Sequence, residues 1–275
     1  MNRLKFGYNT NGFAHHSLQD AIEIIAALGY DGIAITIDVN HLNPFLCEVG
    51  DVTVYRKLLR KHSLKAVVEG GGRYILDRVR KHEPSLISRK GRRRRLEYLQ
   101  VCIAMASHLR AKVVAFASGI KDPNVSEKTS RRHLVDAIRH LCSYAKEHGV
   151  VLALEPEPGM FVETLADYDR IKEESGRDDL RLTLDIGHIY CSEKEPAERI
   201  INMYRNEMAN VHLEDIKGGV HNHLPPGEGD VDFPAVLKAL KAIDYRGLVN
   251  LELSRSSHDA PSVARDALAY IKRIR

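Results

Sequence analysis

Eight short apolar runs recur along this 275-residue chain, and each is followed by a polar turn and then by a segment with helical spacing. The runs are continuous rather than alternating, which is typical of parallel strands buried on both faces. Eight strand–helix units predict a closed parallel (β/α)8 barrel, a fold that needs about 250 residues. The predicted strands are Leu4–Tyr8, Gly32–Ile37, Leu64–Val68, Lys112–Ala117, Val150–Leu154, Arg181–Leu184, Asn210–Leu213 and Leu248–Leu251.

The segments between these runs carry the start and stop signals of helices. Ser17 is a candidate N-cap of the first helix, and Gly29 lies just beyond its end. Three later segments begin with a proline in the first turn, where proline is well tolerated. The predicted helices are Leu18–Leu28, Asp51–His62, Arg92–Leu109, Ser126–His148, Thr164–Glu174, Pro196–Met208, Pro234–Ala242 and Pro261–Ile274.

No linker and no low-complexity stretch divides the chain, so we expect a single domain over residues 1–275. An open doubly wound sheet is the alternative to the barrel. It is disfavoured because no GxGxxG motif follows the first run; the glycine cluster Gly70–Gly72 follows the third. Three long irregular segments, which are typical of lids or binding loops, are expected at Asp38–Gly50, Glu69–Lys90 and Lys217–Val231.

The composition excludes several classes of protein. Hydrophobic residues make up 44% of the chain and charged residues 28%, which excludes disordered, collagen-like and coiled-coil chains. No apolar run approaches the ~18–20 residues of a membrane span, and the N-terminus lacks a signal-peptide pattern. We therefore expect a cytoplasmic protein without membrane contact. The four cysteines form no CxxC motif and predict neither a disulfide framework nor a zinc knuckle.

The net charge of +4 is too weak to indicate nucleic-acid binding by itself. Much of the local excess lies in Arg89–Arg95 (RKGRRRR). This run is either a solvated helix start or a patch for a phosphate or another acidic partner, and we favour the solvated start because charge runs usually lie on the surface. The sequence is compatible with a homo-oligomer.

Four chemistry-bearing residues stand at the ends of the fifth to eighth predicted strands: Glu155, Asp185, His212 and Glu252. In (β/α)8 barrels the carboxyl ends of the strands form the active-site mouth, so these side chains are expected to converge. Three carboxylates and an imidazole in a dry mouth would repel each other unless a cation compensates them. Oxygen donors with one nitrogen suit Mn²⁺, Mg²⁺, Co²⁺ or Zn²⁺, so the pattern predicts one divalent metal ion.

Each of these residues alone has an ordinary structural explanation. A carboxylate after a strand is often the N-cap of the next helix, and a strand histidine is often a satisfied core residue. The combination on four successive strands favours the metal site.

Further polar residues lie near these strand ends and are candidates for substrate binding: His188, Glu157, Lys217, Glu69 and Arg73. His188 follows Asp185 by three residues, and two prolines hold Glu157 in a stiff extended turn. The spacing of His221 and His223 also suits metal ligands, although a histidine pair in a loop is a weak signal for a second metal.

The segments EPEPG, LTLDIGH, NVHLEDIKGG, GEGDVDF and VNLELS resemble the xylose-isomerase-like (sugar phosphate isomerase/epimerase) TIM-barrel superfamily, and the site pattern is most similar to its ketose 3-epimerases. The resemblance covers the chain from about Val150 onward. It implies that one divalent metal is bound by Glu155, Asp185, His212 and Glu252, with the two glutamates also acting as the acid–base pair. It also implies substrate contact by His188. The basic residue after the metal histidine is commonly arginine; here it is most nearly Lys217, at a slightly different spacing.

The resemblance and the chemistry together predict an isomerase or epimerase of a sugar or related polyol ketone, in which a metal-stabilised enediolate forms by proton transfer. One alternative is a keto-inositol dehydratase. Another is a zinc-dependent apurinic-site endonuclease, but Glu69 and Ser118 end the strands where that group has extra histidines. A non-catalytic binding barrel is the third.

Overall fold

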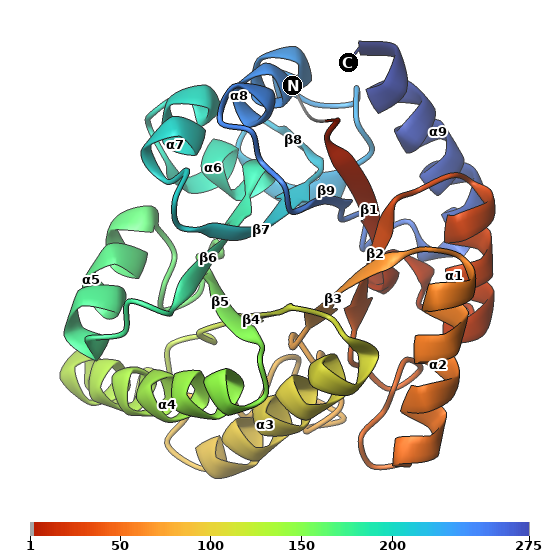
Figure 1. The fold of residues 1–275 in the computed structure, drawn as a ribbon. Helices are drawn as coiled ribbons and strands as arrows, with labels where there is room; N and C mark the ends of the chain where they lie inside the picture. The colour runs from red at the N-terminus through yellow and green to blue at the C-terminus, as the bar shows by residue number, and fades with distance from the viewer. Residues whose placement is uncertain (1–2, 275) are drawn as a thin grey trace.

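A computed structural model describes residues 3–274 of the chain. Eight parallel strands close into a barrel, and the helices form an outer ring around it (Figure 1). This confirms the predicted (β/α)8 TIM barrel. In barrel order the strands are β1 (Lys5–Asn9), β2 (Gly32–Thr36), β3 (Lys65–Glu69), β4 (Val113–Ala117), β5 (Val151–Glu155), β6 (Arg181–Asp185), β7 (Met208–Leu213) and β10 (Leu248–Leu251).

The helices begin at side-chain caps that the sequence supplies. Ser17 accepts a hydrogen bond from the Asp20 amide, and Ser126 accepts one from the Thr129 amide. Short 3-10 helices cover Thr10–Phe13 and Ser257–Asp259. The α-helices are α1 (Leu18–Ala27), α2 (Val49–Lys61), α3 (Arg92–Leu109), α4 (Glu127–Glu147), α5 (Leu165–Ser175), α6 (Ile186–Ser192), α7 (Ala197–Met203), α8 (Phe233–Ala242) and α9 (Ala260–Ile274).

Small residues inside the barrel leave room for larger neighbours. A Cβ atom on Gly7 would lie 2.0 Å from Oδ1 of Asn250, and one on Gly32 would lie 2.6 Å from Cδ1 of Leu248. The two glycines therefore admit the Asn250 and Leu248 side chains to the barrel interior. Asn250 is then fixed there because its Nδ2 donates to Oδ1 of Asn210 at 2.8 Å.

Two sequence predictions were wrong after β5. The segment Lys217–Val231 is not wholly irregular, since β8 (Asp215–Lys217) and β9 (Val220–Leu224) form an antiparallel hairpin. Gly218 and Gly219 form its turn with φ of 60° and 70°, which suits a two-residue hairpin. The helix predicted over Pro196–Met208 is shorter, because α7 ends at Met203 and β7 already begins at Met208.

The arginine run is only partly solvated. Its exposed residues include Arg92, Arg93 and Arg94 at the start of α3, as favoured above. Arg95 is buried, and its guanidinium donates to the carbonyl oxygens of Pro84 and His82 at 2.8 and 3.0 Å. Arg95 therefore binds the preceding loop to α3 rather than facing an acidic partner.

The four cysteines are free. Among residues 3–274, no helix combines the length and the apolarity that a membrane crossing requires.

Candidate active site

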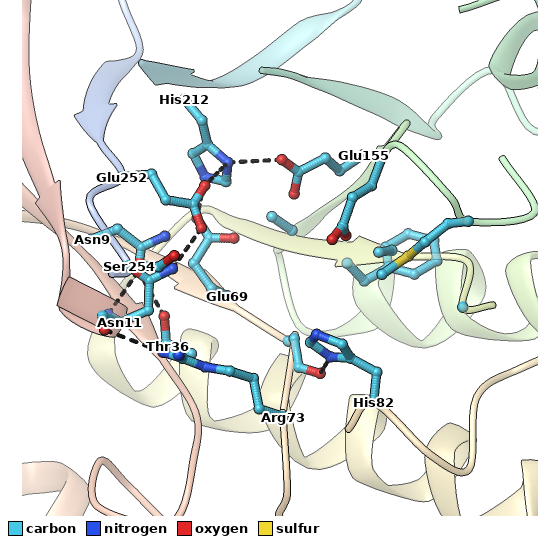
Figure 2. Close-up of a pocket in the computed structure, with 18 of the residues that line it drawn as sticks. Asn9, Asn11, Thr36, Glu69, Arg73, His82, Glu155, His212, Glu252 and Ser254 are labelled. Carbon is cyan, nitrogen blue, oxygen red and sulfur yellow. Dashed lines mark hydrogen bonds and ion pairs between the residues drawn. The ribbon is translucent and has the colours of Figure 1, made fainter. Parts of the chain in front are cut away.

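Four donor side chains converge at the carboxyl ends of neighbouring strands. Glu155 ends β5, Asp185 ends β6, His212 lies in β7 and Glu252 follows β10. One ligand atom from each lies within 4.8 Å of the others. Nδ1 of His212 is 2.9 Å from Oε1 of Glu155 and 2.8 Å from Oε2 of Glu252 (Figure 2). The predicted convergence at the barrel mouth is thus found in the structure.

The donor set fits a divalent cation. Oδ2 of Asp185 is buried and has no hydrogen-bond partner among the described residues. Its other oxygen, Oδ1, accepts from the His188 amide at 3.0 Å and caps α6. A buried carboxylate oxygen without a partner is costly, and here it faces further carboxylates. A divalent ion would satisfy this oxygen and offset the repulsion.

The ionisable groups of this cluster shift one another's pKa values. Burial raises the pKa of Glu155 to about 8 despite its contact with His212. Burial lowers the pKa of His212, but the carboxylates of Glu155, Glu252 and Glu69 outweigh it and raise that pKa well above its usual value. Burial also acts to raise the pKa of Glu252, yet His212 holds it below its usual range. His212 and Glu252 therefore favour each other's charged forms.

The opposite nitrogen of His212 is held by a polar chain in the barrel. Nε2 lies 3.0 Å from Oε1 of Glu69, which also accepts from Nδ2 of Asn210 at 3.1 Å. Asn210 in turn accepts from Asn250. These contacts orient the imidazole so that Nδ1 faces the other donors, as partners of ligating histidines do. Glu69, predicted to contact substrate, thus contacts His212. Asn210 and Asn250 were missed, although each lies two residues before a predicted ligand on the same strand face.

A second group of donors adjoins the first. Nδ1 of His188 donates to the Pro156 carbonyl at 2.9 Å, which leaves the lone pair of Nε2 available as a ligand for a metal. That Nε2 is 3.0 Å from Nε2 of His221, and ligand atoms of His188, His221 and His223 lie within 4.8 Å of one another. The β9 strand therefore brings the histidine pair to His188.

Glu214 is a buried carboxylate that the sequence analysis missed. Both of its oxygens lack a hydrogen-bond partner among the described residues, and Oε1 lies 3.5 Å from Nδ1 of His223. The signal was present, because Glu214 follows His212 by two residues and so shares its side of the chain.

A cavity at the barrel mouth is lined by the other residues predicted to bind substrate, with the exception of Lys217. Glu157 and Arg73 are lining residues, and burial raises the pKa of Glu157. Arg73 donates to the Asn11 carbonyl at 3.2 Å, and Nδ2 of Asn11 donates to Oε1 of Glu252 at 2.5 Å. Lys217 is exposed on the hairpin and does not line the cavity, because β8 carries it outward.

Comparison with known proteins yields a family match over most of the chain. A family model described as "Xylose isomerase-like TIM barrel" matches residues 22–274. The chain is 28% identical to L-ribulose 3-epimerase of Methylomonas sp. (strain DH-1) over 276 residues, covering 92% of this chain and 90% of that protein. It is 28% identical to inosose dehydratase of Geobacillus thermodenitrificans (strain NG80-2) over 131 residues, covering 42% of this chain and 44% of that protein. The latter match therefore spans less than half of the dehydratase.

Solved structures share the fold at lower identity. D-allulose 3-epimerase from Methylomonas sp. superposes with a TM-score of 0.78 and 21% identity, covering 100% of this chain and 99% of that chain. The IolI protein, solved with a bound zinc atom, superposes with a TM-score of 0.74 and 20% identity, covering 98% of each chain.

Proposed function

The chain belongs to the xylose isomerase-like TIM barrel family, and we propose that it is a divalent-metal-dependent isomerase or epimerase of a sugar or related polyol ketone. The observation that carries this proposal is the convergence of four donors at the barrel mouth, with ligand atoms within 4.8 Å of one another. A full-length relative that is an L-ribulose 3-epimerase supports the same chemistry.

In this proposal Glu155, Asp185, His212 and Glu252 hold one ion of manganese, magnesium, cobalt or zinc. When bound, such an ion would stabilise the negative charge that develops on the carbonyl oxygen of the substrate. The zinc atom in the IolI structure supports a metal in a related barrel.

Glu155 and Glu252 would move the proton. Each carboxylate contacts the same nitrogen of His212, at 2.9 and 2.8 Å, so the two flank one point in the mouth. One carboxylate would remove the proton from the carbon next to the carbonyl, and the other would return a proton to the opposite face, which inverts that carbon. Return to the neighbouring carbon would instead interconvert an aldose and a ketose.

The rest of the cavity suits a hydroxyl-rich substrate. His188 and Glu157 lie on the β5 and β6 side, and Arg73 lies on the side of Asn11. These groups supply donors and acceptors that would hold substrate hydroxyls in a fixed orientation.

A dehydratase of a cyclic polyol ketone is the second candidate. The partial match to inosose dehydratase favours it. Its first step, removal of a proton beside a ketone, uses the same residues, and the reaction then continues with loss of a hydroxyl. A zinc phosphodiesterase is less well supported, because Glu69 and Ser118 occupy the strand ends that would carry extra histidines. Ser118 accepts from the Val162 amide at 2.9 Å.

The first test is the metal content of gently purified protein, measured by elemental mass spectrometry. We expect about one equivalent of a divalent metal per chain. The protein is then incubated with a panel of ketoses and inososes in deuterated water. Deuterium at the carbon beside the carbonyl of an epimer or isomer is the expected result, and a dehydrated product would favour the second candidate. Two to three equivalents of zinc with cleavage of abasic DNA, or no metal uptake at all, would contradict the proposal.

A further inference from the structure

A second cavity, of about 590 Å³, lies at the opposite end of the barrel from the candidate active site. Its lining includes the first residues of three strands, Lys65, Val113 and Leu248, whereas the donors described above stand at the carboxyl ends. We infer that this cavity binds an organic phosphate, with its phosphate groups on a rim of cations and its apolar body on the barrel floor. This site is independent of the proposed catalytic function.

The cavity lies at the amino-terminal floor of the barrel. Lys65 of β3 and Val113 of β4 line it from one side. Ala209 of β7 and Leu248 of β10 line it from the other, so strands from both sides of the barrel contribute to it.

The rim of this cavity is entirely basic. Among residues 3–274 its lining contains no aspartate or glutamate. The basic lining residues are Arg56, Lys57, Arg60, Lys65, Arg110, Lys112 and Arg246. Such a concentration of one sign in a cavity attracts an anion, since low-dielectric walls focus the field.

Most of these cations are not neutralised by the protein. In the described part of the chain, no ion pair is formed by Arg56, Lys57, Arg60, Arg110 or Lys112. Arg246 pairs with Asp244.

Lys65 is crowded by a like charge. A contact with Lys5 is the main cause that lowers the pKa of Lys65, and burial adds to it. Asp31 acts in the opposite sense, but its carboxylate is already bound by Arg3 and by the Phe6 amide. An anion at this point would relieve the repulsion between the two ammonium groups.

Favourable interactions with helix carboxyl ends explain the positions of only some of the basic residues on the rim. Arg60 lies in the last turn of α2 and Arg110 directly follows α3, where cations interact favourably with the helix carboxyl ends. Lys65 and Lys112 stand instead at the starts of strands, and no helix end accounts for them.

The floor of the cavity is apolar, which favours a phosphate ligand with an apolar part over inorganic phosphate. It is formed by buried side chains that include Leu59, Leu64, Val67 and Leu248. A volume of about 590 Å³ is within the range of small-molecule sites and exceeds the roughly 110 Å³ of the catalytic cavity. A planar or apolar group carrying several phosphate charges, as in a nucleotide, meets both requirements.

The test is calorimetric titration of the full-length protein with ATP, inorganic triphosphate and adenosine. We expect ATP to bind more tightly than either of its parts, because the rim and the floor both contribute. The double variant Lys65→Glu/Lys112→Glu should weaken ATP binding at least tenfold. Arg89→Glu/Lys90→Glu is the matched control, since it makes the same charge change at exposed positions outside the cavity, and it should change binding less than twofold.

A second variant guards against misfolding. Lys57→Glu/Arg60→Glu alters only the exposed surface of α2 and should also weaken ATP binding, while the protein stays folded with at most a small decrease in melting temperature from the charge reversal near the helix carboxyl end. The inference is overturned if ATP does not bind, if triphosphate binds as tightly as ATP, or if the control pair weakens binding equally. Binding of single-stranded RNA without binding of ATP would likewise overturn it, in favour of a macromolecular partner.

Discussion

One carboxylate oxygen of Asp185 accepts a hydrogen bond from the backbone N–H of His188 at 3.0 Å, while its other oxygen faces the donor cluster without a partner in the described part of the chain. The same side chain therefore begins α6 and points an acceptor at the candidate metal. The N-cap and ligand interpretations of this residue are both compatible with the geometry.

These two contributions can be separated by substitution. Asp185→Asn keeps a good N-cap but removes the charge, so we expect metal affinity to fall roughly 10–100-fold or more with little change in melting temperature. Asp185→Ala should lose the same affinity and in addition about 1 kcal/mol of stability. Metal titration and thermal unfolding of both variants check this. Unchanged metal affinity in Asp185→Asn would remove Asp185 from the ligand set.

Glu252→Gln should slow the exchange of the substrate proton with deuterium by roughly 10²–10⁴-fold, because an amide cannot accept that proton. NMR detection of exchange on an accepted ketone is the measurement. Glu228→Gln is a matched control, since Glu228 is exposed in a loop outside the cavity, and it should exchange normally. Undiminished exchange in Glu252→Gln would exclude a role in proton transfer.

His221→Ala should leave about one equivalent of metal per chain, because His221 is not among the four donors of the first group. Elemental analysis of the variant beside the unaltered protein gives the answer. A decrease from two equivalents to one would instead assign a second ion to His188, His221 and His223. Complete loss of metal would contradict the proposed ligand set.

His82 should make the protein less stable below pH 6.5. Burial lowers its pKa from 6.5 to about 4, and Nδ1 donates to the Gly71 carbonyl. Between these pH values the unfolded chain takes up a proton that the folded chain does not, so stability falls as the pH falls and levels off below about 4. His82→Gln keeps a hydrogen-bond donor for the Gly71 carbonyl and removes the group that takes up this proton. We expect the difference in unfolding free energy, variant minus unaltered protein, to grow by about 2–3 kcal/mol as the pH falls from 7 to 4.5. Urea denaturation at both pH values measures it. A constant difference would contradict the assignment.

Gly7→Ala should destabilise the barrel by about 1–3 kcal/mol, because the new methyl group overlaps Asn250, which a hydrogen bond to Asn210 holds in place. Gly50→Ala is the control, since a Cβ atom there meets nothing within 4 Å and lies in α2. That variant should be neutral or slightly more stable. Denaturant unfolding distinguishes the two, and equal stability would show that Asn250 relaxes freely.

The barrel could be predicted because its signal repeats. Continuous apolar runs gave all eight barrel strands close to their observed bounds; β5, for example, covers Val151–Glu155 against a predicted Val150–Leu154. The placement of Glu155, Asp185, His212 and Glu252 followed from a general rule of this fold, that strand carboxyl ends meet at one mouth.

The hairpin and α6 escaped prediction for physical reasons. β9 reads VHNHL and is half-exposed, so it lacks an apolar run, and the seven residues of α6 are too few to show a helical period. Without the hairpin, nothing brought His223 near Glu214. Lys217 was predicted from its charge, its distance from His212 and the family resemblance, and none of these fixes the direction of a side chain.

Arg95 shows where a compositional argument reaches its limit. Within one run of arginines, three are exposed at the start of α3 and the fourth is buried. Arg95 precedes the buried residues Leu99 and Cys102 by four and seven positions, so it shares their helical face. Helical spacing, not charge, was the informative signal.

β3 has a further consequence for how this chain can change in length. Its five residues place Lys65 in one cavity and Glu69 in the other, with Val67 between them on the same side. Because side chains alternate along a strand, one inserted or deleted residue before Val67 would turn Lys65 away from the basic cavity or Glu69 away from the candidate active site. Lineages of this protein should therefore accumulate insertions and deletions in the loops. The number of residues between Lys65 and Glu69 should stay constant, because both ends of β3 face a cavity.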